Sequence, residues 1–231
     1  MSSPLAIGAV SAVLRNLLDN GLVESGLPLG TIKVSAVAPD TIKLDDPLAP
    51  PSVNVFMHRV SVNTGWTNAA MPSRSQEGRR VTNQPLALDL HYLVTAYGTA
   101  DFQAEILLGY AMYLLHERPV LDRAAIRRAL DPSPLGASIL PPSFQALVAA
   151  DLADQVEAVK IAPEPMDTEE LSRLWSATQA HYRPSAGYVV SVVLIEARKS
   201  AGAALPVLTR GIVVEPSLTL PYPTIERVIP P

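Results

Sequence analysis

The most constraining feature of the sequence is the stretch Val159–Glu196, which places a well-marked helix between two strand-like runs. The first run ends in a proline-rich turn, and Asp167 with Glu170 then forms a capping box that predicts a helix start. Pro184 prevents that helix from continuing. Tyr188–Ile195 carries apolar residues on both phases, which is typical of a central strand buried on both faces. The pattern predicts a packed scaffold.

The clearest period-2 alternation in the chain runs from Leu86 to Ala96 and predicts a strand. Three further segments are rich in β-forming residues and predict strands: 31–37, 53–62 and 156–161. Within 53–62 the apolar phase switches, which predicts a bulge or burial on both faces.

Helical spacing of apolar residues predicts three further helices. Ser3 and Pro4 suit the N-cap and first position of a helix over residues 4–20, which Asn20-Gly21 would end. Asp101 is the expected cap of a second helix that Pro119 ends, and a shorter helix is expected over residues 122–130. Residues 133–143 read as a loop.

Composition excludes several classes of protein. With 231 residues, 48% of them apolar, the chain is long enough to bury a full core. It has no cysteine, so disulfides, thiolate nucleophiles and Cys-ligated metals are ruled out. A net charge of −4 without a basic face argues against nucleic acid as a partner. The longest apolar runs reach about half the ~20 residues of a membrane span, and the N-terminus lacks a signal peptide pattern. We therefore expect that the protein does not insert into a membrane and that it assembles in the cytoplasm.

Two segments stand out as candidate contact regions. The first, Thr64–Gln84, is longer than ordinary loops and contains Trp66, Arg74, Arg79 and Arg80. These arginines suit either an acidic partner surface or a solvated loop. The second is a C-terminal arm, residues 201–231, with a possible edge strand over 207–214 and five prolines in its last seventeen positions. Its apolar residues favour docking on a neighbouring subunit: Leu218, Leu220, Tyr222, Ile225, Val228 and Ile229.

Motifs for chemistry are sparse. The chain has no P-loop, GxGxxG or GxSxG sequence, and its four histidines lack metal-ligand spacing, so we expect no cofactor and no metal. The best acid–base pair is Asp89 with His91, which lie on one face of a strand, where the carboxylate would orient the imidazole. The favoured interpretation is that both simply face away from the core.

Three other candidates have structural explanations. The pair Glu117 and Arg118 lies at a helix end, and Glu169 and Glu170 lie in a first helical turn, where the helix dipole and capping account for them. Trp175 follows the apolar stripe of its helix and is expected in the core instead of in a ligand site.

Three segments together resemble a known family: NQPLALDLHYLVTAYG (83–98), EILLGYAMYLLHERPVL (105–121) and the block Val159–Glu196. They resemble the N-terminal domain of the cap, or tail-terminator, protein of extracellular contractile injection systems, the phage-tail-like particles of the virulence-cassette and antifeeding-prophage types. The resemblance spans roughly residues 4–200 in order. We therefore expect one domain over residues 1–200, followed by the arm.

The resemblance implies an α+β fold, with a mixed, mostly antiparallel sheet flanked by helices, and the predicted element order is compatible with it. It also implies a non-enzymatic protein that forms a homo-hexameric ring on the inner tube, distal to the baseplate, and contacts tube and sheath proteins. Two alternatives stay open at this point. One is an assembly adaptor that does not terminate a tube, and the other is a small hydrolase or ligand-binding domain using Asp89 and His91.

Overall fold

The computed structural model describes residues 3–42, 49–67, 85–131, 147 and 150–196. These form an α+β fold built on one six-stranded sheet in the order β1-β2-β3-β6-β5-β4. Only β1 and β2 pair in parallel, and the other neighbours pair antiparallel, so the predicted mixed, mostly antiparallel sheet is confirmed. The strands are β1 (Lys33–Ser35), β2 (Ser52–Val62), β3 (Leu86–Tyr97), β4 (Val120–Leu121), β5 (Val159–Glu164) and β6 (Ser185–Ile195).

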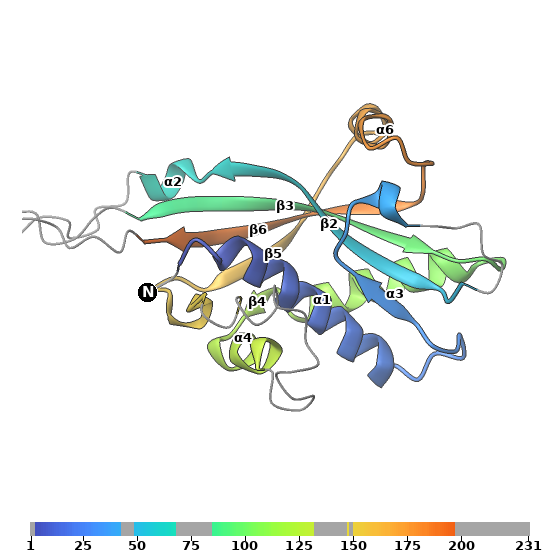
Figure 1. Ribbon diagram of the computed structural model, residues 1–231, viewed down its shortest axis with the longest axis horizontal. Helices are drawn as coiled ribbons and strands as arrows, with labels where there is room; N and C mark the ends of the chain where they lie inside the picture. Colours follow the sequence, from blue (N-terminus) through green and yellow to red (C-terminus); the bar gives the residue numbers. More distant parts are fainter. Residues whose placement is uncertain (1–2, 43–48, 68–84, 132–146, 148–149, 197–231) are drawn as a thin grey trace, which may run out of the picture.

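Helices cover mainly one face of this sheet. Figure 1 shows α1, α3 and α4 on one side and α6 on the other. On β3 the side chains at every second position from Leu88 to Ala96 are buried against the helices. Tyr92 belongs to this set, and its hydroxyl lies 2.9 Å from Ser11 Oγ on α1. The helical segments are α1 (Ala6–Glu24), α2 (Thr64–Thr67), α3 (Gln103–Glu117), α4 (Arg123–Leu130) and α6 (Thr168–Ala177), with 3-10 turns η1 (Pro39–Thr41) and η2 (Leu152–Asp154).

The first helix is longer than predicted. It begins at Ala6 and continues through Gly21 to Glu24, so the expected end at Asn20-Gly21 is wrong. The Ser3 hydroxyl accepts a hydrogen bond from the Leu5 N–H at 3.3 Å just before the helix, which is the contact expected of an N-cap. Gly21 lies within the helix and packs against α3. A Cβ there would lie 2.7 Å from the methyl carbons of Leu114. The missing side chain therefore permits a close contact between two helices.

Two predicted strands differ in extent. The run 31–37 contributes only three strand residues, because Asn54 of β2 takes over the pairing beyond them: its Oδ1 accepts from the Val37 N–H at 3.1 Å, and its Nδ2 donates to the Val37 carbonyl at 2.9 Å. The run 156–161 starts three residues later, at Val159, and extends to Glu164. The predicted bulge in β2 is confirmed by a register shift between Met57 and Arg59.

The start of α3 also differs from the prediction. Phe102, in a left-handed conformation with φ of 65°, precedes the helix, and Asp101 does not cap it. Gln103 folds back instead, and its Oε1 accepts from the N–H groups of Thr99 and Ala100 at 3.0 and 3.1 Å. A Cβ at Gly98 would lie 2.5 Å from the Gln103 Cβ, so this turn requires a glycine.

The helices α4 and α6 follow the sequence more closely. Asp167 accepts a hydrogen bond from the N–H three residues ahead, as its capping box predicts, and Asp122 makes the same contact at the start of the helix expected over 122–130. Strand β6 lies between β3 and β5, as predicted for a central strand. Trp175 of α6 is buried, which confirms the core interpretation.

One end of the sheet holds the attachment points of both candidate contact segments. In register, Val62 pairs with Leu88, and Leu86 pairs with Ile195, so the end of β2, the start of β3 and the end of β6 lie side by side. We name this the exit end of the sheet. The 64–84 segment begins there with the short helix α2, and the chain beyond Glu196 also leaves there. Residues 68–84, 132–146 and 197–231 lie outside the described part, as do the predictions made for them.

Candidate functional site

The predicted pair Asp89 and His91 lies on the face of β3 opposite the three-helix layer, but the two residues do not bind each other. Asp89 accepts from Nδ2 of Asn63 at 2.9 and 3.1 Å. His91 is only 7% exposed and has partners on two other strands. Both residues therefore face away from the helix-covered core, as the favoured interpretation predicts, and the alternative in which Asp89 orients the imidazole does not match the contacts.

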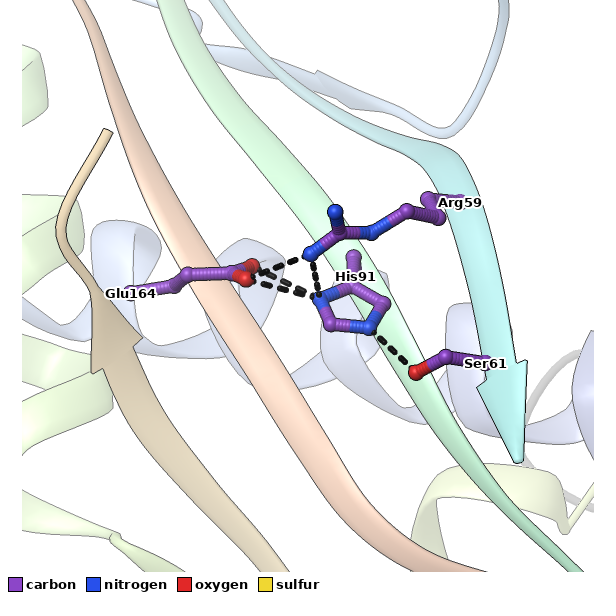
Figure 2. Close-up of polar contacts among 4 residues, drawn as sticks. All are labelled: Arg59, Ser61, His91 and Glu164. Carbon is purple, nitrogen blue, oxygen red and sulfur yellow. Dashed lines mark hydrogen bonds and ion pairs between the residues drawn. The ribbon is translucent and has the colours of Figure 1, made fainter. Parts of the chain in front are cut away.

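Four side chains form a polar cluster around His91, which Figure 2 shows. His91 Nε2 lies 2.7 Å from Ser61 Oγ, and Nδ1 lies 2.9 and 2.8 Å from the two carboxylate oxygens of Glu164. Nη2 of Arg59 donates to Glu164 Oε1 at 2.8 Å and lies 3.1 Å from His91 Nδ1. When Nδ1 donates to the carboxylate, Nε2 accepts from the serine hydroxyl, and the 3.1 Å approach of Arg59 Nη2 to Nδ1 is then not a hydrogen bond because both groups are donors.

The sheet register explains how these residues meet. The β2 bulge changes the side-chain phase, so that Arg59 pairs with His91, and Ser61 comes to lie on the same face. Glu164 arrives from β5, on the far side of β6, where it pairs with Gly187. A Cβ at Gly187 would lie 2.6 Å from the Glu164 carbonyl oxygen and 2.8 Å from the Met166 sulfur, so glycine permits this close approach.

The order Ser61–His91–Glu164 is that of a nucleophile, a base and an orienting carboxylate. Two features favour a structural tie between β2, β3 and β5 instead. The Glu164 carboxylate is shared with the Arg59 guanidinium, so it does not serve the histidine alone. The His91 side chain is 8% exposed, which leaves little surface from which to exchange a proton with a substrate.

A second histidine lies beside the cluster. His58 sits at the β2 bulge, with its ring centroid 6.2 Å from that of His91, and its buried Nε2 has no hydrogen-bond partner. Burial lowers the pKa of His58 below its usual 6.5; Arg59 and His91 act in the same direction, while Glu164 and Glu170 oppose it. The folded state therefore binds protons at His58 less readily than the unfolded chain does.

His58 should make the protein less stable in mild acid. Because its pKa is lowered on folding, the unfolded chain holds more protons near pH 6.5, and stability falls as pH decreases through this value. We expect His58→Gln to reduce the loss of unfolding free energy between pH 7.5 and pH 5, measured by urea titration. His181→Gln, at an exposed position, is the control. An unchanged pH dependence in His58→Gln would contradict this account.

The remaining sequence candidates are dispersed. Glu117 accepts from the Tyr113 hydroxyl at 2.5 Å, and Glu169 pairs with Arg173 on the surface of α6, so neither forms the acidic or charged pair considered from the sequence. Trp66 is half-buried and packs against a small apolar cluster at the exit end, made by Ala87, Val192 and Leu194. The other candidates lie outside the described residues: Arg74, Arg79, Arg80, Leu218, Leu220, Tyr222 and Ile225.

Neither a metal centre nor a membrane span is found in the described part of the chain. No three of its His, Asp or Glu residues are grouped so that they would hold a metal ion. Its helices are all too short or too polar to cross a bilayer.

Comparisons with known proteins place the chain in a family. No curated protein matches its sequence. A cryo-EM structure of the sheath/tube terminator of an extracellular contractile injection system, PVC, in its extended state, matches with 16% identity and a TM-score of 0.48, covering 90% of this chain and 64% of that one. The tube-terminating cap of the anti-feeding prophage matches with 16% identity and a TM-score of 0.47, covering 86% of this chain and 61% of that one. The chain thus spans less than two thirds of either protein. Residues 9–209 match the Pvc16 N-terminal domain, and the chain belongs to this family.

Proposed function

We propose that this chain acts as a structural cap that terminates the inner tube of a contractile injection particle. The observation that carries the proposal is the family match over residues 9–209, which covers all of the described strands and all but the first three residues of α1. The proteins of similar fold are a sheath/tube terminator and a tube-terminating cap. The role is non-enzymatic. The polar cluster around His91 is consistent with this, because its contacts link strands β2, β3 and β5 of the sheet.

The cap forms a homo-hexameric ring at the end of the tube distal to the baseplate, and it contacts the tube protein and the last layer of sheath. A terminator must copy one side of the repeating tube contact while offering no surface to a further ring. It assembles in the cytoplasm and stays with the particle when the particle is released. An adaptor without a terminating role would leave tube length unchanged.

The exit end of the sheet supports the choice of contact segments. Both the 64–84 segment and the chain beyond Glu196 start there, so the two are anchored side by side on one rigid support. We assign tube, sheath or neighbour contacts to these two segments. The residues proposed to make them are Trp66, Arg74, Arg79, Arg80, Leu218, Leu220, Tyr222 and Ile225.

Deleting the gene should produce particles without their distal cap. We expect overlong, ragged or unstable tubes and loss of density at the end opposite the baseplate, because polymerisation then lacks its stop. The measurement is electron microscopy of purified particles, scoring tube length and end density. A plasmid copy of the intact gene should restore both. Capped particles of unchanged length in the deletion strain would refute the terminator role.

A further inference from the structure

Helix α3 has an apolar face that no described residue covers. Its inner side is buried in the core through Leu107, Ala111 and Leu115. A helix at a protein surface normally turns polar residues to solvent. The outer side is nevertheless exposed, by 38–73% per side chain, at Phe102, Ile106, Tyr110, Met112 and Tyr113.

The turn before α3 holds the first of these side chains outward. The Phe102 side chain is 73% exposed. Its backbone φ of 65° is unfavourable for a residue with a side chain. The back-folded Gln103 and the close approach at Gly98 hold this turn together. Strained backbone persists where the surrounding structure imposes it, and it is concentrated at binding sites.

A second apolar surface lies at the exit end of the sheet. Val60 and Val62 pair with Leu90 and Leu88, whose side chains face the helices, so the two valines lie on that same face. Leu86 lies two residues before Leu88 and shares its face. These three side chains are 41%, 55% and 50% exposed, because the described helices do not extend over them. We name them the valine patch.

The two surfaces complement each other in kind and in position. One is the outer face of a helix, which packs on no sheet among the described residues, and the other is a sheet surface that no described helix covers. Phe102 follows the Tyr97 end of β3, whereas the valine patch lies at the exit end, about 33 Å away along β2 if each of its residues rises about 3.3 Å. Unlike surfaces at opposite ends of one chain make head-to-tail contacts, which form a ring when the rotation between successive copies closes.

We propose that the outer face of α3 in one copy packs on the valine patch of the next copy, and so forms the contact within the ring. Taking roughly 200 Å² for a large side chain, the exposed α3 face offers on the order of 500 Å². A stable interface uses about 800 Å² per partner, so this face supplies more than half of one partner's share. The inference rests on the proposed ring-forming cap and names the surfaces that join its copies.

Cysteine cross-linking tests this contact directly because the chain has no native cysteine. Tyr113→Cys and Val62→Cys are made in separate, differently tagged full-length chains and expressed together in cells that assemble particles. A short bis-maleimide linker is then added to purified particles. Each chain carries one cysteine, so a cross-link within one copy is impossible, and a product that carries both tags joins two copies. We expect a heterodimer band carrying both tags, and none when Val23→Cys, on the 75% exposed Val23 of α1, replaces Tyr113→Cys.

The possible outcomes separate this contact from the proposed function. Cross-links only between like variants would overturn it in favour of a symmetric contact. Both variants present on capped particles without the heterodimer band would also overturn it, while leaving the cap role intact. Absence of the wild-type chain from particles would instead refute the proposed function. As an independent measurement, Ile106→Glu should abolish the wild-type oligomer seen by native mass spectrometry of detergent-free particle extracts; Val23→Glu should not.

Discussion

Replacing Gln155 with alanine should lower the free energy of unfolding by about 3–5 kcal/mol, because three backbone groups would lose their partner, at about 1–3 kcal/mol for each buried group. The Gln155 side chain is buried next to β6. Its Oε1 accepts from the Leu194 N–H at 3.3 Å, and its Nε2 donates to the carbonyls of Val192 at 3.0 Å and Glu157 at 2.7 Å. Urea titration of the full chain measures the loss.

An isosteric variant separates the hydrogen bonds from the volume. Gln155→Met keeps the side chain's bulk but supplies no amide, so it should be nearly as destabilising as Gln155→Ala. If methionine costs less than about 1 kcal/mol, the effect of alanine reflects a cavity, and the role assigned to the amide is refuted.

Gln155 explains why one predicted strand was placed too early. The pattern over 156–161 suggests a strand from Val156, but β5 starts at Val159, and β5 pairs with β6 only as far as Ser191. Beyond that point the side-chain amide of Gln155 replaces the strand. Asn54 acts in the same way toward Val37 at the other side of the sheet. Periodicity does not reveal such replacements, because they depend on which backbone groups are left over after the strands have paired.

Short sequence patterns predict the structure best where it depends on residues close together in the sequence. The N-cap at Asp167, the strand from Leu86 and the β2 bulge all follow from short sequence patterns. Gly21 misled the prediction because a glycine that ends a helix and a glycine that admits another helix look alike in sequence.

The polar cluster was only half predictable. Alternation along β3 placed His91 on the outer face, and the phase switch in β2 indicated the bulge that brings Arg59 and Ser61 beside it. Glu164 lies 73 residues further along the chain and two strands away from His91. Only the order of strands in the sheet reveals that contact, whereas the sequence alone points to Asp89, two positions from His91.

His91→Ala should destabilise the protein by about 3 kcal/mol, because it removes a buried ring and leaves Glu164 and Ser61 without their central partner. Ser61→Ala removes one hydroxyl and one hydrogen bond, so it should cost about 1 kcal/mol. If the cluster has a structural role, urea titrations should show this difference between the two losses of unfolding free energy. A catalytic triad predicts instead that both variants abolish hydrolysis to a similar degree, because its members act as a unit.

The two readings are separated by assaying the wild-type chain and both variants on an activated ester. We expect no turnover that depends on Ser61, and we expect Ser61→Ala to cap particles as the wild type does. The unequal stabilities would then assign the cluster to joining β2, β3 and β5. Ester hydrolysis by the wild type that both substitutions abolish, with Ser61→Ala still fully folded, would establish a nucleophilic site and contradict the structural assignment.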